Sequence, residues 1–332
     1  MNIRLEKENI ENQNLSPFAV KSANSLGRFK YEKQCDIRTC FQRDRDRIIH
    51  SKAFRRLMHK TQVFISPEGD HFRTRMTHTL EVAQIARTIA SGLFLNEDLT
   101  EAIALGHDLG HTPFGHLGED VLNDILEEGF SHNEQSVRVV QKIEKNGLGL
   151  NLTKEVLDGI LNHRGKGNPS TLEGKIVQIS DKIAYINHDI DDAIRAKILN
   201  YKDLPKDCLD ILGKTPKEII NFLIRDIIKN SYNKNDIIMT KEIKSTMYKL
   251  RKFLFDNVYT TGILEEERKN YKFILNEIYS YYYNNFKKVP KEFTNICNIG
   301  ETKERAICDY IAGMTDRYAI KIYENLTYKK DF

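Results

Sequence analysis

The chain has 332 residues, of which 40% are hydrophobic and 30% are charged, and its 51 basic and 47 acidic side chains leave a formal net charge of +4. This length and composition can bury a large core, in one big domain or in a domain with a helical annex. The near balance of charge permits an anionic ligand but does not by itself indicate nucleic-acid binding. Five scattered cysteines without a CxxC spacing argue against a disulfide framework or a cysteine zinc site, and favour the reducing cytoplasm.

The N-terminal segment, residues 1–27, is polar and weakly patterned, so we expect a mobile or draped tail. It lacks an apolar run, and no stretch of the chain approaches ~20 uninterrupted apolar residues, so we expect neither a signal peptide nor a membrane span. A turn at residues 67–70, between two short apolar runs, predicts one small β-hairpin near 63–72.

Helical periodicity covers most of the chain beyond this tail. Residues 76–94 have the spacing of an amphipathic helix, and Asn96 and Asp98 offer caps for a second helix that runs to His107. Residues 206–332 shift toward lysine, asparagine and tyrosine but keep helical periodicity, and we interpret their tyrosine cluster as a packing surface. The sequence has no internal repeat, P-loop or GxGxxG motif, and the predicted fold class is all-α.

The longest predicted helix covers residues 171–199. Its isoleucines recur at three- and four-residue steps and form one apolar stripe, namely Ile176, Ile179, Ile183, Ile186 and Ile190. Asp181, Tyr185 and Asp189 fall on a different, roughly opposite face. A helix with isoleucines on one side and a tyrosine between two acids on the other is expected to run through the interior, where polar side chains need a specific reason.

The densest group of histidines lies in the stretch HDLGHTPFGHLGED, residues 107–120. Together with the two long helices, this stretch supplies a mixed set of two imidazoles and two carboxylates: His78, His107, Asp108 and Asp181. Such donors suit Mn²⁺, Fe²⁺, Mg²⁺ or Zn²⁺ better than a metal that prefers thiolates. Each residue taken singly is explained as well by a satisfied core histidine or a surface acid, so the prediction depends on the combination.

The order H…HD…D resembles that of the HD-domain metal phosphohydrolases, and the flanking segments are similar to one branch of them, the deoxyguanosine triphosphohydrolases or deoxynucleoside triphosphate triphosphohydrolases. The segments that carry the resemblance are RDRDRIIHSKAFRRLMHKTQVF, RTRMTHTLEVAQIAR, GHDLGHTPFGHLGE, FSHNEQSVRVV, TLEGKIVQISDKIAYINHDIDDAI and DYIAGMTDRYA. The resemblance implies an HD-type core over residues 28–205 and a C-terminal helical region, 206–332, packed on it.

The resemblance also implies the reaction. A deoxynucleoside triphosphate, dGTP or dNTPs generally, is hydrolysed between the α-phosphorus and the 5′ oxygen, which releases deoxynucleoside and intact triphosphate. This chemistry needs charge neutralisation on the triphosphate, an activated water and a proton for the leaving oxygen. The four candidate ligands then hold a divalent metal ion, Mn²⁺ or Mg²⁺ in the first place, with Fe²⁺, Zn²⁺ and Ni²⁺ as alternatives.

Three further residues are candidates for catalysis, and one of them, His116, matches a catalytic position of the family. His116 corresponds to the histidine that meets the scissile α-phosphate, either as general acid or in positioning the nucleophile. Glu119, three residues further along a helix, is placed to orient that imidazole, and His111 faces the same phosphate. Leu117 stands where the family commonly has alanine, which puts the fine geometry beside His116 in question.

Five residues match the family's substrate contacts. Arg75 and Lys182 correspond to positions that hold the phosphates of a tetra-anionic substrate. Tyr185 and Asp189 correspond to a sugar clamp, in which the ring excludes a 2′ hydroxyl and the aspartate accepts from the 3′ hydroxyl. Gln62 corresponds to a second contact with that 3′ hydroxyl.

Ser131 and Glu134 have the spacing of a capping box, which explains Glu134 as well as a role in the site does. His132 lies between them in FSHNEQS, has the family's pattern and is predicted to bind substrate. The sequence assigns no role to four other histidines: His59, His71, His163 and His188.

Two other classes of function stay open. Another HD-type phosphohydrolase or phosphodiesterase, acting on a cyclic nucleotide, an alarmone or an RNA end, could use His111, His116 and His132 for a second metal, but would not need the sugar clamp. A non-catalytic nucleotide- or nucleic-acid-binding protein would not need every metal ligand and His116. Relatives are often activated by a nucleotide and commonly form hexamers or other oligomers. Besides the dNTP substrate, the sequence therefore leaves open a regulatory nucleotide, single-stranded DNA and the preferred base, and we expect a homo-oligomer.

Overall fold

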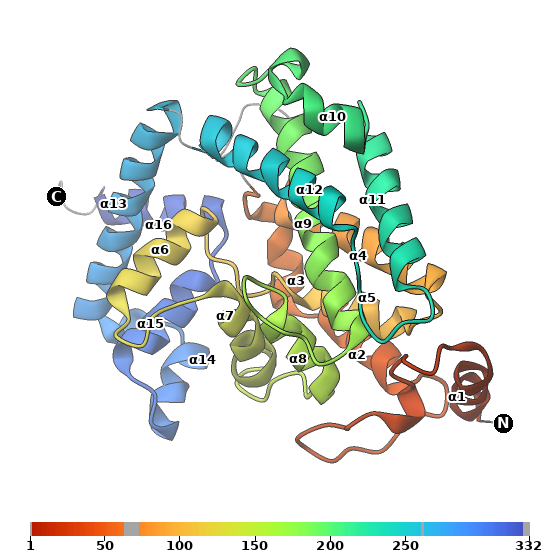
Figure 1. The fold of residues 1–332 in the computed structure, drawn as a ribbon. Helices are drawn as coiled ribbons and strands as arrows, with labels where there is room; N and C mark the ends of the chain where they lie inside the picture. The colour runs from red at the N-terminus through yellow and green to blue at the C-terminus, as the bar shows by residue number, and fades with distance from the viewer. Residues whose placement is uncertain (1, 63–72, 260–261, 328–332) are drawn as a thin grey trace. The chain divides into compact units, whose positions relative to one another are not determined.

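The computed structural model describes residues 2–62, 73–259 and 262–327. Across these ranges the regular structure is helical, and the β-type pairing there consists of two isolated antiparallel bridges, Arg28 with Thr153 and Thr61 with Thr74. The all-α prediction is therefore confirmed (Figure 1). The hairpin predicted near 63–72 lies outside the described residues. No helix in the described ranges is both long and apolar enough to cross a membrane.

The chain folds into two compact units, each assembled from segments that are separate in the sequence. Unit 1 comprises Met1–Asp46, His78–Leu105 and Thr153–Leu264, and unit 2 comprises Arg47–Thr77, Gly106–Leu152 and Glu265–Phe332. The division into a tail, an HD-type core and a C-terminal region came from the family resemblance and stays a prediction.

The helices that lie wholly or mainly in unit 1 are α1 (Ile3–Asn14), α2 (Cys40–Ile49), α4 (Arg75–Gly92), α5 (Glu97–Gly106), α8 (Lys154–Asn162), α9 (Leu172–Arg195), α10 (Lys206–Leu212), α11 (Pro216–Ser231) and α12 (Lys241–Leu254), with the short segments η1 (Ser22–Asn24), η4 (Tyr201–Asp203) and η5 (Phe255–Tyr259). Helix α9 is the element that α8, α11 and α12 all pack against (Figure 1). It begins where the Thr171 side chain accepts a hydrogen bond from the backbone N–H of Gly174 at 3.0 Å, which caps its first turn.

The predicted isoleucine stripe of α9 lies in the core. Ile176, Ile183, Ile186 and Ile190 are buried, while Ile179 is half-buried. Burial of each such side chain contributes about 1.5–3 kcal/mol to stability. The same helix also buries polar residues on its other sides, so it lies in the interior, as predicted.

The segment expected to be a draped tail contains a helix, α1, and is tied to the core beyond it. One oxygen of the Glu173 carboxylate accepts the backbone N–H of Val20 at 3.0 Å and that of Asn96 at 3.1 Å. Asn96 in turn accepts the N–H of Leu99 at 3.1 Å, which confirms the predicted cap of α5. A single carboxylate thus anchors the N-terminal segment to the starts of two core helices.

Unit 2 holds α3 (Lys52–Arg56), η2 (Leu57–His59), α6 (His116–Ile125), α7 (His132–Arg138), η3 (Val139–Ile143), most of α13 (Gly262–Asn284), η6 (Phe286–Lys288), α14 (Lys291–Thr294), η7 (Asn295–Ile299), α15 (Lys303–Ala312) and α16 (Asp316–Thr327). Its apolar core joins side chains of α6, α13 and α15, among them the fully buried Leu122, Leu275 and Ile311. Tyr282 belongs to this core and meets Tyr310 edge-on, with ring centroids 5.1 Å apart. The packing role predicted for the tyrosine cluster is confirmed for this residue.

The buried Glu173 carboxyl should make stability depend on pH. Burial raises its pKa to about 7, although the N–H groups of Asn96 and Val20 act in the opposite direction. Between about pH 4.5 and 7 the folded state therefore holds a proton that the unfolded state has lost, so stability falls as pH rises through this window. Glu173→Gln keeps an acceptor oxygen and has no charge. Its free energy of unfolding relative to the wild type should rise by roughly 3 kcal/mol from pH 4.5 to pH 8 in urea titrations; parallel pH profiles would contradict this.

Candidate active site

The histidine-rich stretch of unit 2 turns between α5 and α6 with the help of two glycines. A Cβ at Gly110 would lie 2.2 Å from the backbone nitrogen of Ser136, so only glycine lets this turn lie directly against α7. Gly115 precedes α6 with φ +61°, a conformation that other residues rarely adopt. The turn is also bonded to α7, because the Ser136 hydroxyl lies 2.8 Å from both the N–H of Gly110 and the carbonyl of His107.

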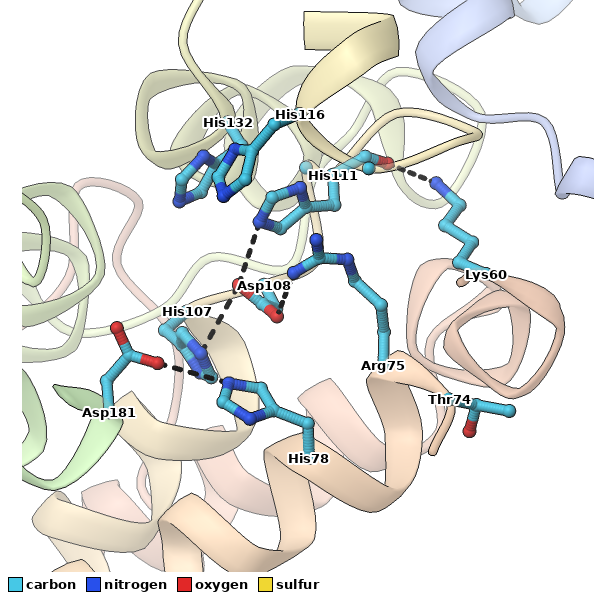
Figure 2. A network of polar contacts seen from close by, with 12 residues as sticks. Lys60, Thr74, Arg75, His78, His107, Asp108, His111, His116, His132 and Asp181 are labelled. Carbon is cyan, nitrogen blue, oxygen red and sulfur yellow. Dashed lines mark hydrogen bonds and ion pairs between the residues drawn. The ribbon is translucent and has the colours of Figure 1, made fainter. Parts of the chain in front are cut away.

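Asp108 lies at the centre of this turn and is almost fully buried. One of its oxygens accepts a hydrogen bond from the guanidinium of Arg75 at 2.9 Å (Figure 2). The other lies 3.3 Å from Nε2 of His107 and 3.3 Å from Nε2 of His111. Burial alone would raise the pKa of Asp108, but the two imidazoles and the guanidinium outweigh it and hold this pKa well below its usual value. Asp108 is therefore held as a carboxylate in the interior.

A second carboxylate, Glu119, holds two more histidines. Its Oε2 lies 3.0 Å from Nδ1 of His116 and 3.1 Å from Nδ1 of His132. Despite the burial of Glu119, these hydrogen bonds hold its pKa well below the usual value. The His116 side chain is 48% exposed, whereas His132 is buried and stacks on His111 with ring centroids 3.9 Å apart. One ring of the group therefore faces outward while a buried carboxylate fixes its orientation.

The capping box predicted from Ser131 and Glu134 is wrong. Ser131 makes no side-chain cap hydrogen bond and Glu134 is exposed. The N–H of His132, in the first turn of α7, is donated to Oε1 of Glu119 at 3.0 Å instead. Glu119, which lies on α6, therefore caps α7 from another helix. An anion at the start of α7 is also favoured by the positive end of the helix dipole.

In unit 1 the predicted ligand His78 on α4 faces α9. Its Nε2 lies 3.1 Å from Oδ1 of Asp181 (Figure 2), and its ring packs on that of Tyr185 with centroids 4.7 Å apart. Its other nitrogen, Nδ1, lies 3.2 Å from Nδ1 of His188. Asp181, Tyr185 and His188 follow each other at steps of four and three residues, so they share one face of α9. His188 was given no role by the sequence.

Gln62 and Lys60 are buried in unit 2 on the short segment that precedes the undescribed residues. Neither polar atom of the Gln62 side chain has a hydrogen-bond partner among the residues that the structure describes, which is unusual for a buried amide and typical of a group that meets a ligand. The Lys60 ammonium donates to the backbone carbonyl of His111 (Figure 2) and to that of Ala312. Burial lowers the pKa of Lys60 to about 7. Sequence patterns gave Lys60 no role, since its partners are carbonyls from distant segments.

Asp316, at the start of α16, fixes the same region. Its two oxygens accept the backbone N–H of Thr61 at 2.8 Å and that of Phe114 at 3.0 Å. The segment before Gln62 and the turn before His116 are thus held by one buried carboxylate. The motif DYIAGMTDRYA carries this residue, but only the fold shows what it bonds.

Two further predicted residues, Lys182 and Asp189, lie on α9, and their roles stay predictions. Lys182 is half-buried beside Asp181, and Asp189 is buried beside His188. Arg75 is fully buried and holds Asp108, a contact in addition to the predicted one with phosphate.

Each unit holds two of the four predicted metal ligands, and each pair has a spacing that suits an ion. The ligand atoms of His78 and Asp181 lie 3.1 Å apart, and those of His107 and Asp108 lie 3.3 Å apart. Two neighbouring ligands about 2.1–2.2 Å from one ion are separated by about 3 Å, so both pairs fit a divalent ion with nitrogen and oxygen ligands. The structure also groups Asp108, His111 and His132 closely enough to share an ion.

Comparison with known proteins defines the class. Residues 75–186, which include all four candidate ligands, match the HD domain, and residues 237–325 match the phosphohydrolase-associated domain. The chain therefore combines a helical HD domain with a phosphohydrolase-associated domain.

Full-length relatives define the family. A deoxyguanosinetriphosphate triphosphohydrolase-like protein of Caldanaerobacter subterraneus subsp. tengcongensis is 60% identical over 326 residues, which cover 98% of this chain and 96% of that protein. A protein of the same description from Clostridium perfringens is 56% identical and covers 98% of both chains, and one from Pelagibacter ubique is 41% identical over 92% of this chain and 98% of its own. The chain belongs to the deoxyguanosinetriphosphate triphosphohydrolase-like family.

The cap that Glu119 provides to α7 can be tested through stability. Glu119→Ala leaves the buried N–H of His132 without its acceptor, so the free energy of unfolding should fall by about 2 kcal/mol. Glu134→Ala is the matched control, because this exposed side chain lies in the same first turn and should change stability by less than about 0.5 kcal/mol. The measurement is urea unfolding of both variants. A larger loss of stability in Glu134→Ala than in Glu119→Ala would contradict the cap by Glu119 and support the capping box.

Proposed function

We propose that the protein hydrolyses deoxynucleoside triphosphates, dGTP or dNTPs generally, to deoxynucleoside and inorganic triphosphate in a metal-dependent reaction. The observation that carries the proposal is the pair formed by His116 and Glu119, an outward-facing imidazole oriented by a buried carboxylate. The relatives' description as deoxyguanosinetriphosphate triphosphohydrolase-like supports the choice of substrate. The five cysteines are free, and we place the enzyme in the cytoplasm.

His78, His107, Asp108 and Asp181 would hold the divalent ion, Mn²⁺ or Mg²⁺ in the first place. Such an ion supplies positive charge that neutralises the phosphate oxygens and acidifies a bound water. The protein's own part is to keep these ligands in the ionised or neutral form that binds. Arg75 does this for Asp108, because its guanidinium helps to hold the carboxylate pKa well below its usual value.

The proposed reaction forms a bond between water oxygen and the α-phosphorus and breaks the bond from phosphorus to the 5′ oxygen. The leaving oxygen needs a proton, which His116 can donate. The proton that the attacking water loses passes to solvent, and the exposed His116 regains its own proton from solvent before the next turnover. Since Nδ1 of His116 is engaged by Glu119, Nε2 is the nitrogen that faces substrate. Glu119 then stabilises the protonated ring before transfer, as a carboxylate does for a general-acid histidine. His111 and Lys182 complete the phosphate contacts in this proposal.

The sugar clamp accounts for selection of deoxyribose. The Tyr185 ring would close against C2′, while Asp189 and Gln62 would bond the 3′ hydroxyl. Burial of the Gln62 amide without a partner among the described residues supports this role, because a ligand hydroxyl would satisfy it.

The competing hydrolase with a second metal is less well supported. Its ligands would include His111 and His132, whose rings are stacked with an interplanar angle of 16°. Stacked rings keep their nitrogen lone pairs in two nearly parallel planes, which disfavours joint coordination of one ion.

The reaction is tested by its products. The purified protein, incubated with each dNTP and NTP and with Mn²⁺ or Mg²⁺, should release deoxynucleoside and inorganic triphosphate from dNTPs. The measurement is anion-exchange chromatography of the quenched reaction. Release of monophosphate or pyrophosphate would contradict the proposed bond cleavage and favour another HD-type hydrolase.

His116→Ala should lower turnover by at least about 10²–10⁴-fold, because the proton donor is lost. The amount of bound metal, measured by mass spectrometry of the dialysed protein, should stay unchanged. His59→Ala is the control, since this exposed histidine has no assigned role and should leave turnover as it is. Loss of metal from His116→Ala would make His116 a ligand instead of a proton donor.

Tyr185→Ala should reduce the ratio of kcat/KM for a dNTP over the matching NTP by at least about tenfold, since the group that excludes the 2′ hydroxyl is removed. Tyr185→Phe keeps the ring, including its packing on His78, and should keep the ratio. Steady-state kinetics on paired nucleotides gives the answer, and an unchanged ratio in Tyr185→Ala would remove Tyr185 from the sugar clamp.

A further inference from the structure

His188 and Glu81 lie behind the predicted ligand His78, and no role has been assigned to either. Glu81 stands three residues after His78 on α4, and His188 stands seven residues after Asp181 on α9. His78 and His188 are both buried, at 0% and 3% exposure. Because these two imidazoles are in contact in the interior, their hydrogen-bond partners determine which of the ring nitrogens carry protons.

Three contacts run through the group in series. Nε2 of His78 lies 3.1 Å from Oδ1 of Asp181. Nδ1 of His78 lies 3.2 Å from Nδ1 of His188. Nε2 of His188 lies 2.5 Å from Oε2 of Glu81. The series therefore joins a carboxylate to the predicted ligand through one imidazole.

The positions of the protons follow from the carboxylate end. A nitrogen 2.5 Å from a carboxylate oxygen must carry a proton, because two acceptors at that distance would repel. Nε2 of His188 is therefore the donor, and in the neutral ring its Nδ1 is then an acceptor. With a divalent ion bound between Nε2 of His78 and Asp181, the proton between the two rings belongs to Nδ1 of His78, and Nε2 keeps its lone pair for that ion.

We propose that His188, backed by Glu81, is a positioning residue that fixes the tautomer and the ring orientation of His78 for binding a divalent metal ion. A metal ligand must present an unprotonated nitrogen, and the series makes that nitrogen Nε2, the atom beside Asp181. A carboxylate at the far end also makes the ligand nitrogen a better donor, since each hydrogen bond polarises the next. This inference rests on the metal site of the proposed function.

The test measures metal binding without nucleotide. Mn²⁺ is titrated into the full-length, metal-free protein, and free Mn²⁺ is read by electron paramagnetic resonance. His188→Leu removes the acceptor and should weaken Mn²⁺ binding by about 10–100-fold. His188→Asn places an amide oxygen near the position of Nδ1, so it should recover most of the affinity.

A matched control separates positioning from packing. Asn187→Leu changes the neighbouring buried residue of α9, whose amide donates to the carbonyl of Ile183 within the same helix at 2.8 Å. This variant should lose stability in thermal unfolding but bind Mn²⁺ as the wild type does. A general loosening of α9 would instead weaken binding in Asn187→Leu and His188→Leu alike.

The outcomes distinguish the inference from the function on which it rests. Wild-type affinity in His188→Leu, or equal losses in His188→Leu and His188→Asn, would overturn the positioning role while leaving the metal site in place. If the wild type binds no Mn²⁺, or if His78→Ala binds it unchanged, the proposed metal site fails and the inference fails with it.

Discussion

Burial of the Asp108 carboxylate is the constraint on which the site depends. An ion without partners in a protein interior would be too costly to keep, so the fold must bring cations and donors to it. Arg75 meets this need, and its backbone N–H is bonded to the carbonyl of Lys60 at 3.0 Å. Lys60 in turn holds the carbonyl of His111, so one chain of bonds joins the start of α4 to the histidine-rich turn. His78 follows Arg75 by one turn of α4.

The second carboxylate, Glu119, contacts three groups at once. It caps α7, holds the buried His132 and orients the half-exposed His116. The Glu119 carboxylate cannot move without breaking its hydrogen bond to the start of α7, so the orientation of His116 is held rigid. In the proposed reaction such rigidity suits His116 as the proton donor, because its imidazole must already point at the leaving oxygen when the bond breaks.

Sequence periodicity predicted the helices whose apolar stripes face a core, such as α4 and α9, because that spacing is imposed by burial. It did not predict α1, whose sequence IRLEKENIENQN has few apolar residues and whose contacts lie elsewhere in the chain. The capping box failed because Glu119, from another helix, took the donor that a local side chain would have used.

The candidate site likewise has features that the sequence predicted and features that it did not. The candidate ligands were proposed from a family's spacing and stay predictions, whereas the contact between His116 and Glu119, which their three-residue spacing implied, is confirmed. His188, Lys60 and Asp316 could not be predicted, since each acts on atoms that only packing brings near. His188 also lies beside Asp189, and periodicity alone does not decide which of two adjacent polar residues on α9 faces His78.

The central claim is that water attacks the α-phosphorus while His116 protonates the departing 5′ oxygen. Hydrolysis of a dNTP in H₂¹⁸O, followed by mass spectrometry of both products, tests this most directly. One ¹⁸O atom should enter the triphosphate and none the deoxynucleoside. Label in the 5′ hydroxyl of the deoxynucleoside would place the attack on carbon and contradict the assignment of His116 to the leaving oxygen.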